Sequence, residues 1–224
     1  MKKLFIHAKV NKKVVILKNV IEKLPARVGL VTTIQFLYQL QDIKKQLEKE
    51  GKEVHIAGQV LGCRADLAER IKDKVDAFLY IGSGQFHPIK VALVTKKQVF
   101  QLHPDSSKLV KLDKSVIEKY EKKRKASYAK FLTAKKVGVL VSTKVGQNDN
   151  KINKYSKQLK MKGAGELLER KDKEYYLFAF NTLNELDLEN FPFVECWVNT
   201  ACSRIADEKV NIINIDDIRE FEKE

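Results

Sequence analysis

The sequence predicts an α/β protein made of two similar open, mostly parallel sheets that are flanked by helices. One observation is that short apolar runs rich in β-branched residues alternate with segments of helical period, which favours parallel strands joined by right-handed crossovers. The other is an internal repeat, because Lys136–Thr143 (KVGVLVST) has the same pattern as Ala26–Thr33 (ARVGLVTT). Both segments place an apolar strand with an internal glycine before a Ser/Thr pair, so we expect two copies of one domain.

The first copy is predicted over residues 25–106. Its first strand, Arg27–Thr33, is a short apolar run that follows Pro25. Apolar residues at helical spacing from Ile34 to Leu47 predict the next helix, and Gly51 is a suitable stop after it. The remaining elements expected in this copy are a strand at Val54–Ala57, a loop at Gly58–Cys63, a helix at Ala65–Ile71, a strand at Ala77–Ile81, a helix near Ile89–Val94 and a strand at Lys97–Leu102.

The second copy is predicted over residues 136–224, after a basic helical linker at 107–135. Residues 1–24 form an N-terminal extension in which two short apolar runs, Leu4–Ile6 and Val14–Leu17, favour a small hairpin or an added sheet edge. The elements expected in the second copy are a helix near Asp149–Lys162, a strand at Tyr175–Phe180, a short helix near Leu183–Leu188, a strand at Phe193–Val198 and an amphipathic helix from Asn214 to Glu224 with an acidic first turn.

Charge and hydropathy limit the function classes. The chain of 224 residues has 43 basic and 29 acidic residues, a formal net charge of +14, so it attracts polyanions or acidic proteins. The segment Lys108–Lys136 holds 11 of the basic residues and three acidic ones; it is either an electrostatic contact surface or a solvated helix face. No apolar run approaches the roughly 20 residues of a membrane helix, and no signal-peptide stretch is present. We therefore expect a cytoplasmic protein with no membrane partner.

Three cysteines without a secretory signal argue against a disulfide framework. Cys63 and Cys202 each follow a predicted strand and have an arginine nearby in sequence, Arg64 and Arg204, which favours the thiolate. Each is a core cysteine or a ligand, and the repeated arrangement favours a ligand. Cys196 alternates with apolar residues in the last strand, and we interpret it as a structural core thiol. The chain lacks a C-x-x-C pair, so a local zinc or ferredoxin-type site is not supported.

Two loops after predicted strands could bind an anionic ligand. In Gly82–Pro88 (GSGQFHP), Gly82 and Gly84 form a turn whose backbone N–H groups suit a carboxylate or phosphate. His87 is either a residue of the helix start with a satisfied hydrogen bond or part of the site. The loop Ser142–Gln147 (STKVGQ) combines hydroxyls, a cation, a glycine and an amide, which suits an amino-acid-like ligand, and its spacing is not that of a P-loop.

Five blocks in order resemble the diphthamide-biosynthesis family, whose archaeal-type members are 2-(3-amino-3-carboxypropyl)histidine synthases. They are VGLVTTIQF (28–36), GQVLGC (58–63), DAFLYIGSGQFHP (76–88), GVLVSTKVGQ (138–147) and WVNTACSRIA (197–206), over about 180 residues. Gln85 departs from the pattern, since the family usually shows arginine there, and so does Ser203, where it shows proline.

The resemblance implies a 4Fe-4S cluster and S-adenosylmethionine as cofactors. Family members cleave S-adenosylmethionine to an aminocarboxypropyl radical that attacks a histidine of translation elongation factor 2. Cys63 and Cys202 match two of the three cysteines that hold the cluster. The third has no counterpart, because the chain resembles a short form that lacks the N-terminal domain. Lys144, Gly146 and Gln147 would contact the carboxylate of the methionine part, Gly82 to Gly84 would offer backbone donors, and Arg204 would balance the charge of the cluster.

Three functions remain open at this point, and no catalytic residue is identified. The first is a transferase in which Cys63, Cys202 and a further ligand from another subunit, the substrate or solvent hold the cluster. The second is a non-catalytic subunit that supports a catalytic partner, so a homodimer or a heterodimer is expected. The third is a basic RNA- or ribosome-associated protein on the same fold; the lack of an aromatic RNA-binding signature or a GXXG clamp disfavours it.

Overall fold

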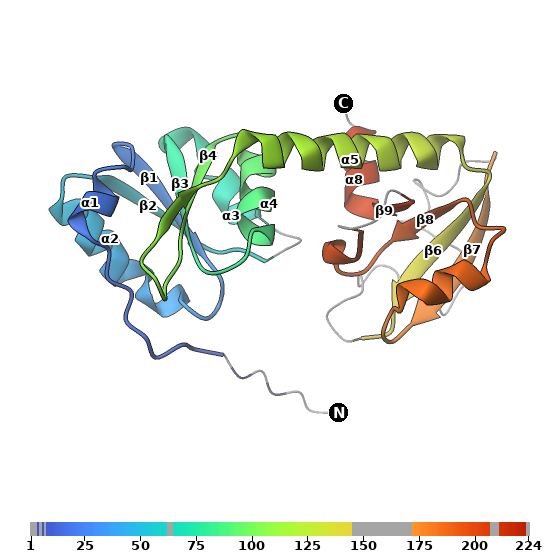
Figure 1. Ribbon diagram of the computed structural model, residues 1–224, viewed down its shortest axis with the longest axis horizontal. Helices are drawn as coiled ribbons and strands as arrows, with labels where there is room; N and C mark the ends of the chain where they lie inside the picture. The colour runs from blue at the N-terminus through green and yellow to red at the C-terminus, as the bar shows by residue number, and fades with distance from the viewer. Residues whose placement is uncertain are drawn as a thin grey trace. The chain divides into compact units, whose positions relative to one another are not determined.

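A computed structural model describes Leu4, Ile6 and residues 8–61, 65–144, 172–206 and 211–222. The chain divides into two compact units, Met1–Ile117 and Glu118–Glu224, and each unit holds one sheet (Figure 1). Two mostly parallel sheets flanked by helices confirm the predicted fold class. The finer limits at 25–106, 107–135 and 136–224 stay predictions. Within the described ranges, none of the helices combines the length and the apolar character that a membrane crossing requires.

The first unit contains a five-stranded sheet. Its strands are β1 (Arg27–Thr32), β2 (Glu53–Gln59), β3 (Ala77–Ile81), β4 (Gln98–Leu102) and β5 (Leu109–Lys111). Their order is β2-β1-β3-β4-β5, with β5 antiparallel to β4 and every other pair parallel. The helices of this unit are α1 (Lys18–Ile21), the 3-10 helix η1 (Leu37–Gln39), α2 (Leu40–Lys49), α3 (Asp66–Glu69), the 3-10 helix η2 (Lys72–Lys74) and α4 (Phe86–Thr95).

The second unit contains a four-stranded sheet and most of the long helix α5 (Lys114–Thr133). Its strands are β6 (Lys136–Ser142), β7 (Glu174–Phe180), β8 (Cys196–Asn199) and β9 (Ile212–Asn214). Their order is β7-β6-β8-β9 and all pairs are parallel. The remaining helices are the 3-10 helices η3 (Glu185–Asn190) and η4 (Ser203–Ala206), and α8 (Ile215–Phe221).

Both sheets have apolar residues on their two faces, which explains why the central strands are continuous apolar runs. In the first unit, Val28 and Leu30 of β1 pack in one core cluster with Ile43 of α2. Phe78 and Tyr80 of β3 lie in the cluster on the other face, which also contains residues of α4. In the second unit, one cluster joins β6 and β8 with α5 and α8, and the other gathers around Trp197 of β8.

The internal repeat in the sequence corresponds to the same packing arrangement in the two sheets. Gly29 of β1 is paired with Phe78 of β3, and a Cβ atom at Gly29 would lie 2.6 Å from that ring. Gly138 of β6 is paired with Trp197 of β8, where a Cβ atom would lie 2.4 Å from the indole. Real Cβ atoms do not approach other atoms so closely. The glycine in each central strand therefore makes room for a large ring on the neighbouring strand.

The first residues differ from the expected hairpin. Among the described residues of 1–24, none lies in a strand, and the segment contains α1 instead. The N–H of Val14 donates to Oε1 of Gln39 at 2.7 Å, and the N–H of Ile16 donates to Oε1 of Gln46 at 3.0 Å. These glutamine side chains take the role that a partner strand would have, so the extended segment is fixed without a sheet.

Several element limits also differ from the predictions. Ile34–Phe36 form a turn, because the N–H of Phe36 donates to the carbonyl of Thr33 at 3.2 Å, so the helical segment begins at Leu37. The helix expected at Ala65–Ile71 is reduced to α3, β2 extends to Gln59, and η3 replaces the α-helix expected at Leu183–Leu188. The short strands β5 and β9 were not predicted, whereas β3 and the C-terminal helix α8 confirm the predictions. The helix expected near Asp149–Lys162 lies outside the described residues.

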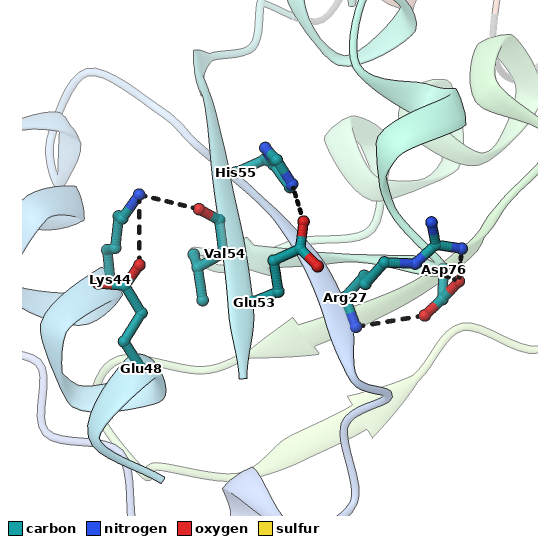
Figure 2. Close-up of polar contacts among 7 residues, drawn as sticks. All are labelled: Arg27, Lys44, Glu48, Glu53, Val54, His55 and Asp76. Atoms are coloured by element: carbon teal, nitrogen blue, oxygen red, sulfur yellow. Dashed lines mark hydrogen bonds and ion pairs between the residues drawn. The ribbon is translucent and has the colours of Figure 1, made fainter. Parts of the chain in front are cut away.

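The β2 edge of the first sheet carries polar side chains (Figure 2). Nζ of Lys44, from α2, donates to the carbonyl of Val54 at 3.0 Å and lies 3.4 Å from the carboxylate of Glu48. On the strand itself, Nε2 of His55 lies 2.8 Å from Oε1 of Glu53. The charged side chain of Lys44 therefore binds a backbone carbonyl of the edge strand that no strand of the described sheet uses.

Candidate functional site

The predicted glycine turn lies directly after β3 and leads into α4. Gly82 (φ +153°) and Gly84 (φ +75°) both have positive φ, which favours glycine. A Cβ atom at Gly82 would also lie 2.5 Å from the hydroxyl of Tyr80. Gly82 is buried, whereas Ser83, Gly84 and Gln85 are exposed. The turn therefore presents its last three residues at the surface of the first unit.

One buried side chain holds two carbonyls of this turn. Nε2 of Gln101, in β4, donates to the carbonyl of Gly82 at 2.9 Å and to that of Gly84 at 3.1 Å, and Gln101 is 4% exposed. The N–H of Gly82 donates to the carbonyl of Leu102 at 3.1 Å. The prediction that Gly82 offers its backbone N–H to a ligand is therefore wrong, because the sheet already uses that N–H.

His87 lies in the first turn of α4 and contacts the residues that shape the glycine turn. Its ring stacks on that of Tyr80, with centroids 5.9 Å apart and planes at 16°, and Nδ1 lies 3.5 Å from the Tyr80 hydroxyl. Burial raises the pKa of Tyr80 to about 12, so this hydroxyl stays protonated at neutral pH. The structure thus shows a half-buried helix-start histidine beside the turn, and its role in a site stays a prediction.

Cys63 and its neighbours Gly62 and Arg64 lie outside the described residues. The described residues on either side of them line a cavity of about 280 Å³ at the carboxyl end of β2. Leu61 and Leu67 give it apolar walls, and Asp66 and Arg70 add charge. In a parallel sheet, this end of the strands is where ligands gather. The cavity therefore lies at the expected end of the first sheet.

The loop after β6 is described only as far as Lys144, so Gly146 and Gln147 lie outside the described residues. Thr143 is tied to the end of β7, because its N–H donates to the carbonyl of Phe180 at 2.7 Å. The N–H of Lys144 donates to Oγ of Ser142 at 3.2 Å, and Lys144 is half-buried. Local hydrogen bonds thus fix the start of this loop at the carboxyl end of the second sheet.

Cys202 lies in the loop between β8 and η4 and is a free, half-buried thiol. Its carbonyl accepts from Nδ2 of Asn199 at 2.9 Å and from the N–H of Ile205 at 3.0 Å. Thr200, two residues before Cys202, donates from Oγ1 to the carbonyl of Leu140 at 2.7 Å. These bonds place the thiol at the carboxyl end of β8, which agrees with a ligand role and does not test it.

Cys196 is the core thiol that the sequence predicted. It is fully buried at the start of β8, and burial raises its pKa to about 12, so it stays a thiol at neutral pH. It shares a core cluster with Val198, whereas Val194 packs in the cluster on the other face. The expected alternation fails at Val194 because β8 begins at Cys196. Cys196 begins β8, whereas Cys202 follows its end. The two thiols therefore lie at opposite ends of the strand and form no disulfide.

The described residues do not contain a complete metal site. Among them, no group of three or more His, Cys, Asp or Glu side chains is placed to hold a metal ion. Cys202 is a half-buried free thiol, whereas Cys196 is excluded by its full burial. Arg204, in η4, is exposed and lies two residues after Cys202. The described part of the second unit could therefore supply one thiolate ligand, Cys202, and Arg204 is a cation close to it in sequence.

The basic segment Lys108–Lys136 is only partly available to a partner. Five lysines of α5 are exposed, namely Lys114, Lys119, Lys122, Lys125 and Lys130. Arg124 is buried instead and forms ion pairs at 2.7 Å with Asp217 and Glu220 of α8. Part of the positive charge that marked this segment in the sequence therefore stabilises the second unit.

Sequence reasoning missed Gln101 and Asn199, the side chains that hold the two loops. Each is a buried amide near the carboxyl end of a strand, Gln101 in β4 and Asn199 as the last residue of β8. A glutamine or an asparagine within an otherwise apolar strand is the signal that could have pointed to them. Their partners could not have been found in that way, because the bonds of Gln101 reach back 17 and 19 residues.

Comparisons with known proteins identify the family of this chain. A family model for diphthamide synthesis proteins matches residues 1–223. The chain is 37% identical over 194 residues to a 2-(3-amino-3-carboxypropyl)histidine synthase of Pyrococcus horikoshii, covering 83% of this chain and 52% of that protein. It is 27% identical over 195 residues to subunit 1 of the Caenorhabditis elegans synthase, covering 80% of this chain and 45% of the relative.

A solved structure extends the likeness to three dimensions. The crystal structure of Dph2 from Pyrococcus horikoshii with a 4Fe-4S cluster superposes on this chain with a TM-score of 0.73 and 33% sequence identity. The match covers 89% of this chain and 58% of the Dph2 chain. The chain thus spans about half the length of the curated relatives that it matches. Since the family model covers nearly the whole sequence, the chain belongs to the diphthamide synthesis protein family.

Proposed function

We propose that this chain acts in the first step of diphthamide synthesis in the cytoplasm. The reaction is the iron-sulfur, S-adenosylmethionine-dependent transfer of a 3-amino-3-carboxypropyl group to a histidine of translation elongation factor 2. The observation that carries the proposal is the family match over residues 1–223, which includes the loop that places Cys202 after β8. The name of the Pyrococcus synthase and the cluster in the related crystal structure support the reaction and the cofactor.

The proposed iron ligands are Cys63 of the first unit and Cys202 of the second. Both follow a strand of a parallel sheet in the sequence, and Cys202 is a free thiol that is only half-buried. A third cysteine ligand, as the family resemblance implies, is not supplied by Cys196, because that thiol is buried in the core. When bound, the cluster supplies the one-electron chemistry that splits a carbon–sulfur bond of S-adenosylmethionine. A third ligand from another subunit, the substrate or solvent completes the set.

The chain's other residues bind and orient the substrate in this proposal. Lys144, with Gly146 and Gln147, attracts the carboxylate of the methionine part. The exposed part of the glycine turn around Gly84 offers backbone donors, and His87 lies beside it. Arg204 lowers the cost of holding a negatively charged cluster next to Cys202.

The test is the iron and acid-labile sulfide content, with electron paramagnetic resonance, of the chain purified without oxygen. We expect about four irons per cluster in the unmodified chain, and loss of the signal in Cys63→Ala and in Cys202→Ala. Cys196→Ala is the matched control, because it removes a thiol of the same unit from the core; it should keep the iron. Retention of the full cluster by Cys202→Ala would reject the proposed ligand set.

A second candidate is a supporting subunit of a heterodimeric synthase. The observation that favours it is the burial of Cys196, which leaves two of the three cysteines of the chain for iron. A chain that binds no iron alone, but restores aminocarboxypropyl transfer to elongation factor 2 when mixed with a three-cysteine synthase, would establish this role. Cleavage of S-adenosylmethionine by the chain alone would exclude it.

A further inference from the structure

The loop that carries Cys202 is held by the last residue of β8. Oδ1 of Asn199 accepts from the N–H of Ala201 at 3.0 Å, and Nδ2 of Asn199 donates to the carbonyl of Cys202 at 2.9 Å. These partners fix the orientation of the amide, because a backbone N–H only donates and a carbonyl only accepts. One side chain therefore bonds the residue before the thiol and the residue of the thiol itself.

The amide of Asn199 is in turn fixed by a buried series of polar side chains. Nδ2 of Asn199 also donates to Oδ1 of Asn214 at 2.7 Å, and Nδ2 of Asn214 lies 3.3 Å from Oδ2 of Asp217. Nε of Arg124, in α5, donates to Oδ1 of Asp217 at 2.7 Å. The four side chains are between 1% and 8% exposed. A continuous hydrogen-bonded series thus joins α5 to the Cys202 loop within the second unit.

Such a series costs desolvation and is retained only where every member finds a partner. An apolar side chain at position 199 would fill the same space but would leave the N–H of Ala201 and one bond of the Cys202 carbonyl without that partner. The network therefore does more than fill the core: it determines where residues 200–202 lie after the strand ends. A fixed loop lowers the entropy that a thiolate loses when it binds a metal.

We propose that Asn199 is a positioning residue for the Cys202 thiol, and that Asn214, Asp217 and Arg124 hold Asn199 in place. The iron-binding purpose of this positioning rests on the proposed function, whereas the positioning itself is a property of the metal-free chain. Asn199 does not touch the reacting atoms. Its effect reaches the thiol through the backbone of the loop.

The test is the rate at which iodoacetamide alkylates Cys202 in the metal-free full-length chain, resolved by peptide mass spectrometry. Asn199→Asp keeps the shape of the side chain and the acceptor for Ala201, but it places a carboxylate oxygen against the carbonyl of Cys202. We expect the loop to open more often and alkylation to become faster by at least about fivefold, the factor that one lost hydrogen bond implies, because the carboxylate cannot donate to the Cys202 carbonyl or to Oδ1 of Asn214. Glu195→Ala is the matched control, because it removes the acceptor for the N–H groups of Lys135 and Lys136 at the other end of the same sheet.

A second variant tests the series away from the loop. Asp217→Asn keeps the shape but presents an N–H group to Arg124 or to Nδ2 of Asn214, so it breaks one link of the series. We expect a change of the same sign and smaller size. Equal alkylation rates in Asn199→Asp, the unmodified chain and Glu195→Ala would overturn the proposal. If Asn199→Asp does not fold, an unchanged rate in folded Asp217→Asn would overturn it equally.

Iron content separates this proposal from the proposed function. Faster alkylation in Asn199→Asp, in a chain whose unmodified form binds no iron, would support the positioning role and reject the iron role of Cys202. Iron that depends on Cys202, with alkylation unchanged in both network variants, would support the proposed function and reject Asn199 as a positioning residue.

Discussion

Nε of Arg124 and Oδ1 of Asp217 lie 2.7 Å apart in the core of the second unit, where the two residues are 8% and 7% exposed. Burial lowers the pKa of Arg124, but the charges and hydrogen bonds of Asp217 and Glu220 outweigh it and the pKa is raised. The arginine thus stays charged inside the unit, and the surrounding structure depends on its carboxylate partners.

Replacing Arg124 with methionine should lower the free energy of unfolding by about 3–5 kcal/mol, because Asp217 would remain as a buried charge without its main partner. Denaturant unfolding measures the change. Arg219→Met is the control, since Arg219 forms a more exposed ion pair with Asp216 at 3.1 Å, and such pairs contribute about 0–1 kcal/mol. A double variant, Arg124→Met with Asp217→Leu, should recover much of the loss. Equal effects of Arg124→Met and Arg219→Met would contradict the prediction.

Gln101→Leu should weaken the binding of S-adenosylhomocysteine, used as an unreactive stand-in for the substrate, because the carbonyls of Gly82 and Gly84 lose their common donor. Isothermal titration calorimetry measures the affinity. The matched control is Gln98→Leu in the same strand, whose amide donates to the carbonyls of Val99 and Leu112, both at 3.0 Å. Both variants should lose about 1–3 kcal/mol of stability. Only Gln101→Leu should lose affinity, and a loss of equal size in Gln98→Leu would reject a specific role for the turn.

Gly138→Ala should destabilise the second unit by about 1–3 kcal/mol, because the added methyl group overlaps the indole of Trp197. Thermal unfolding followed by circular dichroism measures the effect, because the single tryptophan of the chain is the residue replaced in the second background. The same substitution in a Trp197→Leu background should cost less, since the smaller side chain leaves room. An unchanged cost in that background would show that the ring is not the obstacle.

Glu195 makes the second unit sensitive to acid. The N–H groups of Lys135 and Lys136 donate to its carboxylate at 2.6 and 3.4 Å and lower its pKa below the ordinary 4.5. A lowered pKa in the folded state adds stability above the unfolded-state value, and this contribution is lost as the pH falls through the folded-state pKa. The stability difference between the unmodified chain and Glu195→Gln should therefore shrink as the pH falls from neutral through and below 4.5. A difference that stays constant over this range would contradict the assignment.

The strands could be predicted because a strand that is buried on both faces of its sheet is a continuous apolar run in the sequence. Ala77–Ile81 is apolar at every position, and β3 has these limits. The start of the helix after β1 was predicted too early, because Thr33 bonds Gln35 through their side chains and the N–H of Phe36 closes a turn. Local polar bonds of this kind compete with a helix and do not alter the apolar spacing that predicted it.

The candidate site was predictable only in its exposed parts. The cysteine loop and the glycine turn are visible as small and polar residues after apolar runs. The series from Arg124 to Asn199 is not, since it joins side chains that are 93 and 15 residues apart. Arg124 in particular is one of 11 basic residues in Lys108–Lys136, and only its acidic partners in α8 distinguish it from its exposed neighbours.

The ammonium group of Lys44 on the carbonyl of Val54 bears on the behaviour of the protein at high concentration. An open edge strand invites a second molecule to extend the sheet, which is a common route to aggregation during expression and storage. A lysine held over that edge already occupies one of its backbone acceptors, so an approaching strand of a second copy finds one hydrogen-bond partner fewer. Lys44 thus protects this edge of the first sheet from strand addition, a role separate from that of the cysteine loops.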